Sequence, residues 1–175
     1  NSSYNSTVEQ TVATVTSNLA EGDWPENTEV TLTTATQGAT ILVSINDAEF
    51  TPYSEPIVIT GPIKITAYAE ASGMKDSDKV TFNYSIATIK PIAEVRSYVK
   101  GQLALIEGII THKAGREMYV QDATGAIVLY DFDSEVANVG DKVRVGGVME
   151  IYNGLQELKP DPHFDYSVIE KNVGV

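Results

Sequence analysis

The residues with the clearest binding chemistry are cations and tyrosines in the second half of the chain. Lys113, Arg116 and Tyr119 lie close together, and Tyr130 follows them. Lysine and arginine bind phosphate groups, and aromatic rings stack on bases, where each stacked base contributes about 1–3 kcal/mol. Three further candidates for ligand binding are Tyr152, Asn153 and Gln156.

Acidic residues around these candidates would oppose a polyanionic ligand. Glu117, Asp122, Asp131 and Asp133 are all nearby in sequence, and the whole chain has 24 acidic against 12 basic residues, a net charge of -12. Such a field argues against bulk binding to nucleic acid or to an anionic membrane surface. Two interpretations follow. The region binds single-stranded nucleic acid or an oligosaccharide, or the tyrosines only cover the fold while the cations solubilise a turn.

We expect no catalytic residue, metal site or cofactor. The 175 residues include no cysteine, and the two histidines, His112 and His163, are far apart in sequence. No G-x-S-x-G turn accompanies either histidine, as a serine hydrolase of the common type would require. The D-F-D-S-E run at 131–135 lacks the glycine and the distal glutamate of a calcium loop. Paired carboxylates for glycoside hydrolysis would not be visible in a sequence.

The sequence predicts an all-β chain. No window of 12 or more residues keeps a helical apolar stripe, whereas short runs rich in β-branched and aromatic residues recur between turn residues. Spacing of this kind is typical of a β-sandwich or barrel. In the first half the expected strands are 11–17, 29–34, 40–45, 57–60, 63–69 and 80–86.

The second half predicts a five-stranded Greek-key barrel of OB type. A short helix at 92–98 precedes a long apolar strand, in which Gly108 would permit a sharp bend. A D-A-T-G turn and a Y-N-G turn then define two hairpins. The expected barrel strands are 103–111, 116–122, 125–130, 141–150 and 155–159, with one more strand at 164–169 in the tail.

An OB barrel binds its ligands on the face of strands 2 and 3 and with the loops that follow strands 1 and 4. If Met118 and Val120 point into the barrel, then Glu117, Tyr119 and Gln121 point outward. The loop after strand 1 is expected at 111–116, and the loop after strand 4 contains the Y-N-G turn. The candidates would then share one surface.

A domain boundary is expected near residue 88. Nine of the 12 lysine and arginine residues follow it, and the A-T-I-K-P segment at 87–91 contains a proline that would stop strand pairing. We therefore expect a β-sandwich at 1–88 and an OB domain with a C-terminal tail at 89–175.

The first half resembles the β-sandwich repeat of chitobiase and hexosaminidase C-terminal domains, also described as fibronectin type III-associated. The resemblance rests on E-V-T-L-T-T-A-T-Q-G-A-T-I at 29–41, Y-S-E-P-I-V-I at 53–59, I-K-I-T-A-Y-A at 63–69 and G-M-K-D-S at 73–77. The segment 43–52 departs from the family pattern.

The second half is similar to OB-like domains of secreted bacterial nucleases, nucleotidases and surface lipoproteins. The similarity rests on M-Y-V-Q-D-A-T-G-A-I-V-L-Y at 118–130, V-G-D-K-V-R-V-G-G at 139–147 and Y-N-G-L-Q-E-L at 152–158. In neither family is this portion the catalytic part, so the resemblances imply an accessory role.

Together these observations predict a non-catalytic segment of an exported bacterial protein, at the cell surface or outside the cell. The chain begins with Asn1, without a basic and apolar leader, and we expect a fragment of a longer protein. No run of 18 apolar residues is present, so no membrane insertion is expected. The expected partners are single-stranded nucleic acid or oligosaccharide, or other domains of the same polypeptide. The alternative is a structural spacer or a protein-interaction module.

Overall fold

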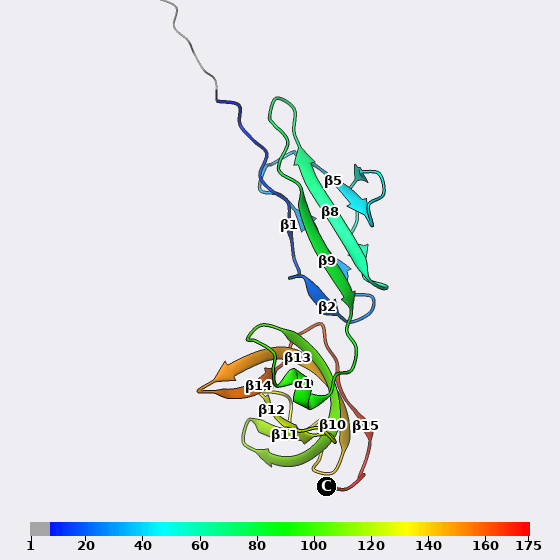
Figure 1. Ribbon diagram of the computed structural model, residues 1–175, viewed down its shortest axis with the longest axis vertical. Helices are drawn as coiled ribbons and strands as arrows, with labels where there is room; N and C mark the ends of the chain where they lie inside the picture. Colours follow the sequence, from blue (N-terminus) through cyan, green and yellow to red (C-terminus); the bar gives the residue numbers. More distant parts are fainter. Residues whose placement is uncertain (1–7) are drawn as a thin grey trace, which may run out of the picture. The chain divides into compact units, whose positions relative to one another are not determined.

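The computed structural model describes residues 8–175, and the chain in it divides into two compact units (Figure 1). The first unit comprises residues 8–21 and Asn27–Ser85, and the second comprises Gly22–Glu26 and Ile86–Val175. Strand β2 (Gly22–Trp24) therefore belongs to the second unit by its contacts. Within residues 8–175, no helix has the length and apolar character needed to cross a membrane. The domain limits expected from the sequence stay a prediction.

The first unit consists of short strands around one longer sheet. The sheet runs in the order β9-β8-β5-β6, and two-stranded pairs form between β1 and β4 and between β3 and β7. Buried residues come from the sheet and from the pairs, for example Ile65 and Val30. The strands are β1 (Thr16–Ser17), β3 (Glu29–Val30), β4 (Leu32–Thr33), β5 (Thr40–Ile45), β6 (Thr51–Pro52), β7 (Ile57–Val58), β8 (Ile63–Glu70) and β9 (Val80–Ile86).

Strands β5 and β9 have the limits predicted from the sequence, but the strand expected at 11–17 is wrong in extent. Only Thr16 and Ser17 pair with another strand. The physical reason is that the backbone upstream has a different partner, since Val12 N–H donates to Lys75 O and Lys75 N–H donates to Gln10 O.

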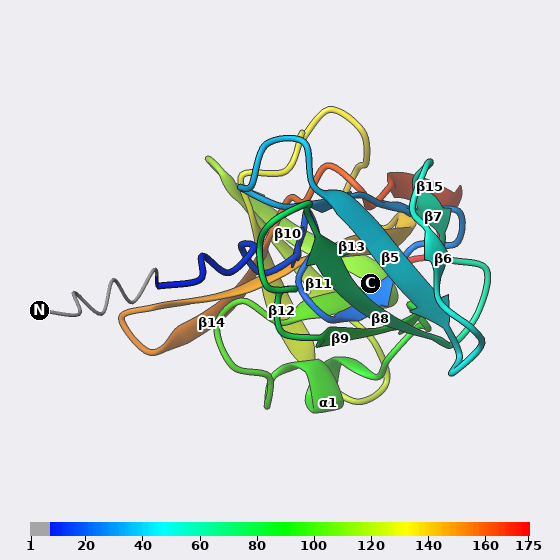
Figure 2. The same cartoon turned by 90° about the horizontal axis from the view of Figure 1, so that it is seen from above.

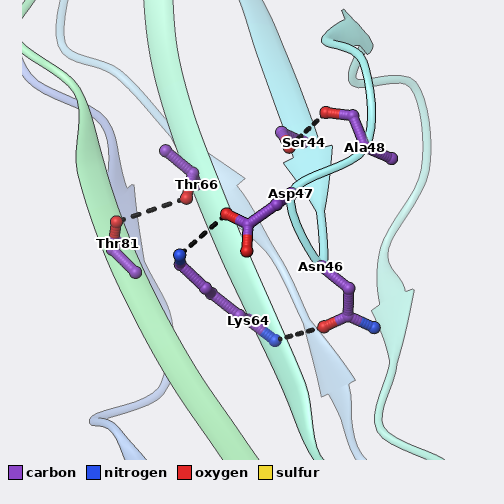
Figure 3. Close-up of polar contacts among 7 residues, drawn as sticks. All are labelled: Ser44, Asn46, Asp47, Ala48, Lys64, Thr66 and Thr81. Atoms are coloured by element: carbon purple, nitrogen blue, oxygen red, sulfur yellow. Dashed lines mark hydrogen bonds and ion pairs between the residues drawn. The ribbon is translucent and has the colours of Figure 1, made fainter.

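A polar network fixes the turn after β5 (Figure 3). Asn46 and Asp47 both have positive φ, 50° and 64°. The Asn46 side-chain oxygen accepts from Lys64 N–H at 2.9 Å, and Asp47 Oδ1 accepts from Lys64 Nζ at 2.7 Å. One lysine of β8 thus binds both residues that carry the unusual backbone conformation.

The second unit contains a closed barrel of five strands, β10 (Leu103–Ala114), β11 (Glu117–Gln121), β12 (Ala126–Tyr130), β13 (Lys142–Tyr152) and β14 (Leu155–Lys159). The strand order is β10-β11-β12-β14-β13, and β10 pairs with β13 to close the ring. β12 and β14 are parallel, and the other pairs are antiparallel. An all-β chain with an OB-type barrel, as the sequence predicted, is thereby confirmed.

The barrel closes because β10 is shared by two neighbours. Residues 103–109 pair with β13, whereas residues 109–114 pair with β11. Gly108 lies at this changeover, and a Cβ atom there would be 2.5 Å from Val120 Cγ1 and 2.7 Å from Gln121 O. The close approach of β11 therefore requires glycine at this position.

Helix α1 (Ile92–Val95) and β15 (Tyr166–Glu170) complete the second unit. Ile92 and Val95 are fully buried in the barrel core, and β15 pairs with β13 outside the ring. The helix is shorter than the predicted 92–98 because the next residues form tighter bonds, with Ser97 N–H donating to Glu94 O and Tyr98 N–H to Val95 O. The only tryptophan, Trp24, packs edge-on to His163 with 4.9 Å between ring centroids.

The β13–β14 hairpin projects from the barrel in both views (Figures 1 and 2). At its tip Tyr152 is 64% exposed, and Ile151 and Leu155 are also exposed. The loop expected at 111–116 is much shorter than predicted, because β10 continues through a bulge after Ile110 as far as Ala114. Both connections are therefore tight hairpins.

We predict that Gly108→Ala destabilises the barrel by about 1–3 kcal/mol, because the new methyl group overlaps Val120 and the Gln121 carbonyl. Gly125→Ala is the matched control, since its Cβ would meet nothing nearer than 3.7 Å. Urea unfolding followed by Trp24 fluorescence reports on the second unit. Equal midpoints for the two variants would contradict the prediction.

Candidate ligand-binding groove

The outer face of the barrel carries the two predicted stacking tyrosines. Met118 and Val120 are 1% and 0% exposed, so their neighbours on β11 face outward, as the alternation predicts. In the register of β11 with β12, Tyr119 lies opposite Val128, and Glu117 lies opposite Tyr130. Tyr119 and Tyr130 therefore lie on the same face of the sheet. They are not directly opposite each other, because each is paired with a different residue.

Tyr130 lies between two cations. The Arg116 guanidinium is 4.9 Å from its ring centroid and Lys159 Nζ is 5.2 Å from it. Arg116 is also held by Asp131, with Nε donating to Oδ1 at 2.7 Å and a second bond to Oδ2. This contact lowers the pKa of Asp131 and keeps both groups charged. The charge of Arg116 is therefore largely compensated.

The ammonium group of Lys113 is bound by two backbone carbonyl groups. It donates to the backbone carbonyls of Ser134 and Ala137, the second at 2.9 Å. The reason is the length of β10, which carries Lys113 as a strand residue beside the connection after β12. Lys113 thus stabilises that connection, and the role predicted for it in ligand binding stays a prediction.

The three candidate residues of the β13–β14 hairpin occupy different environments. Asn153 has a φ of 49° and forms the turn with Gly154, so its place is explained by backbone geometry. Tyr152 is exposed at the tip. Only Gln156, on β14, lines a hollow of the barrel surface.

Two hollows share Arg96 and Gln156, and we call them together the Arg96 groove. One has a volume of about 310 Å³ and the other of about 140 Å³. The smaller is bordered by Tyr119 on β11 and Leu155 on β14. The remaining lining residues are Ala93, Ser97, Thr124, Ala126, Ile127 and Val128. Of the residues predicted to bind a ligand, Tyr119 and Gln156 line this groove and the others do not.

Asp122 fixes the position of helix α1 at this groove. Its Oδ1 accepts from the Thr124 and Gly125 N–H groups at 2.7 and 2.9 Å, and its Oδ2 accepts from Ile92 N–H at 2.9 Å. Burial alone raises the pKa of Asp122, but the hydrogen bonds from Thr124, Ile92 and Gly125 outweigh it and lower the pKa. The hairpin turn thus binds the helix that carries Arg96 at its end.

Arg96 was not among the residues expected from the sequence. It is the C-cap residue of α1, and its side chain is exposed and makes no ion pair or hydrogen bond within residues 8–175. One feature of the sequence indicates that Arg96 is exposed. Ile92 and Val95 are the apolar residues that the short helix buries, and Arg96 is not on that buried side.

Glu157 is an unusual carboxyl group on the same outer face. It lies between Val128 on β12 and Glu150 on β13 and is only 4% exposed. Glu150 is paired with Lys100 at 2.8 Å, but Glu157 has no hydrogen bond or ion pair within the described chain. Burial raises the pKa of Glu157, Lys159 lowers it, and the charges of Glu117 and Glu150 raise it further.

A larger hollow of about 630 Å³ lies beside β10, and none of the predicted residues lines it. Its carboxylate Glu107 already binds Arg144 at 2.6 Å and Lys142 at 3.4 Å. Those contacts lower the pKa of Glu107 and compensate its charge. Within residues 8–175, no group of three histidine or acidic side chains is placed to hold a metal ion. We take the Arg96 groove as the candidate site because Tyr119 and Gln156, two of the predicted residues, line it.

The barrel defines the class of fold, and the comparisons with known proteins define no family. No protein-family profile and no curated protein sequence matches the chain. Among solved structures, the chain is similar to the Ifi202 HINa domain, solved with a 20-base-pair double-stranded DNA, at 14% identity and a TM-score of 0.42, over 91% of this chain and 93% of that one. It is also similar to the p204 HINb domain, at 14% identity and a TM-score of 0.39. That match covers 82% of this chain and 98% of the HINb chain.

These findings correct the family resemblances stated from the sequence. Neither the chitobiase C-terminal-like repeat nor the OB-like domain of secreted nucleases is matched, and the solved structures that are matched include HIN domains. The quoted sequence runs are explained by strand and turn preferences that unrelated β proteins share. Identities of 14% and TM-scores below 0.5 transfer no ligand to this chain.

We predict that Asp122→Ala destabilises the second unit by about 1–3 kcal/mol at pH 7, since the acceptor of several backbone and side-chain donors is lost. The pKa of Asp122 is lower in the folded state, so its contribution is present above about pH 4 and is lost as the pH falls through the folded pKa. Unfolding curves at pH 7 and pH 3 measure the difference. Asp133→Ala, which removes a single bond to Glu135 N–H, is the control and should change little.

Glu157→Gln has the opposite expected sign and should stabilise the barrel at pH 7 by about 0.2–1 kcal/mol, because like charges directly opposite each other are removed. The pKa of Glu157 is raised by folding, so wild-type stability is full at acid pH and declines as the pH rises through the folded pKa. The gain should therefore vanish at acid pH. Glu150→Gln is matched in chemistry but loses the ion pair with Lys100, and it should give no gain.

Proposed function

We propose that the chain is a non-catalytic accessory segment of an exported protein, and that its barrel binds an oligosaccharide in the Arg96 groove. The observation that carries this proposal is the lining of the groove. Tyr119 offers an aromatic face, Gln156 offers an amide without a side-chain partner among the described residues, and Leu155 and Val128 are apolar. Concave sites of this mixed kind, with few polar groups, are typical of small-ligand binding.

The charges of the barrel favour a saccharide over a polynucleotide. Lys113 and Arg116 are bound by protein oxygen atoms, and the adjoining face carries Glu117, Glu150 and Glu157. A strand with a phosphate at every nucleotide would lie against these carboxylates, and binding through counterion release would be weak. A mainly neutral ligand avoids that repulsion.

Single-stranded nucleic acid is the second candidate, and Tyr130 is the observation in its favour. A stacking ring between Arg116 and Lys159 has the elements that a nucleotide requires, an aromatic face for the base and cations for the phosphate. The two candidate functions thus depend on different tyrosines.

For the first unit we propose a β-sandwich that acts as a spacer, and for the whole segment a location outside the cell or on the surface of a bacterium. The net charge of -12 supports this role because acidic surfaces favour solubility. A spacer or protein-interaction role for the entire chain is the alternative to ligand binding.

We predict that Tyr119→Ala and Gln156→Ala each weaken oligosaccharide binding about tenfold or more, whereas Tyr130→Ala leaves it unchanged. Isothermal titration with a panel of oligosaccharides measures the effect, and circular dichroism checks the fold of each variant. A labelled oligothymidine is titrated in parallel at two salt concentrations. Salt-sensitive binding lost in Tyr130→Ala would favour the nucleic-acid candidate, and no binding to either ligand class would favour a spacer.

A further inference from the structure

The cations of the second unit divide into those with a partner and those without. Seven of its nine lysine and arginine side chains bind an acidic residue, a backbone carbonyl or an aromatic ring, namely Lys90, Lys100, Lys113, Arg116, Lys142, Arg144 and Lys159. Within the described chain, Arg96 and Lys171 have no such partner. Of these two, only Arg96 lines the Arg96 groove.

Arg96 and Gln156 are the two residues common to both hollows, and neither side chain has a hydrogen-bond partner within residues 8–175. By contrast, the hydroxyl groups at the edge are occupied as donors, with Thr124 donating to Asp122 at 2.6 Å and Ser97 donating to Glu94 O at 2.6 Å. The free side-chain donors of the groove are therefore one guanidinium and one amide, and both border each of its two hollows.

This pair of donors selects a planar anion. A guanidinium presents parallel N–H groups that match a carboxylate in a bidentate arrangement, which is stronger than a neutral hydrogen bond. The anchoring of α1 by Asp122 holds the backbone at Arg96 in place. We propose, on the basis of the oligosaccharide function above, that Arg96 and Gln156 recognise the carboxylate of a uronic acid residue, so that the ligand is an acidic oligosaccharide.

The surroundings limit how many charges the ligand carries. The groove holds one unpaired cation, and Glu117, Glu150 and Glu157 lie on the same outer face of the barrel. Two adjacent anionic residues would place one of them near these carboxylates without a counter-charge. A saccharide in which uronate alternates with a neutral sugar places one carboxylate at Arg96 and neutral rings elsewhere.

The test compares a hexasaccharide of alternating uronate and N-acetylhexosamine with the same molecule after reduction of its carboxyl groups to alcohols. We expect the wild-type chain to bind the acidic form about tenfold or more tightly than the reduced form. Arg96→Ala should abolish that preference, and Arg96→Lys should restore part of it. Lys171→Ala is the matched control, because it removes a cation that does not line the groove, and it should not alter the preference.

Each contrary result has a distinct meaning. Equal binding of the two forms, weakened by Tyr119→Ala but not by Arg96→Ala, would overturn the carboxylate preference and leave the oligosaccharide function intact. A preference lost equally in Lys171→Ala would show attraction by net charge and would overturn the assignment to Arg96. If neither saccharide binds, or only the oligothymidine binds, both the inference and the oligosaccharide function are overturned.

Discussion

The close approach of β10 and β11 at Gly108 is the constraint on which the rest of the barrel depends. With no side chain there, one strand can pair with β13 along its first part and with β11 along its second. That sharing closes the ring and leaves no free edge among the five strands. Strand β11, which carries Tyr119, is the strand that approaches Gly108. The proposed binding surface therefore depends on a backbone requirement elsewhere in the barrel.

A second link runs from the turn of the β11–β12 hairpin to helix α1. Asp122 satisfies donors of its own turn and the backbone N–H of Ile92 with the same carboxylate. Helices this short have little stability of their own, so such an anchor decides where the chain lies. The two elements of the proposed binding site, the β11–β12 face and the end of α1, are thereby linked to each other.

Local sequence signals predicted most of the strands and only part of the groove. The limits of β5, β9 and β14 followed from β-branched runs between turn residues, and the barrel order followed from the two hairpin turns. Lys113 was misplaced because a bulge after Ile110 extends β10, and no residue type there signals a bulge. Tyr119 and Gln156 were predicted, but Arg96 depended on the position of α1, which a non-local bond to Asp122 determines. The family resemblances failed because runs of alternating β residues are shared by many unrelated folds.

The projecting β13–β14 hairpin gives this barrel a region whose length can vary at low cost. The outermost residue pairs of the hairpin are Ile151 with Gln156 and Tyr152 with Leu155. Near the tip, Ile151, Tyr152 and Leu155 are exposed and do not belong to the barrel core. An insertion of two residues in each strand would keep every side chain on its present face, since the pleat repeats every two residues. Leu155 and Gln156 border the groove. Evolution could thus lengthen or shorten one wall of the groove, and so accommodate ligands of different size, without altering the packing that keeps the protein folded.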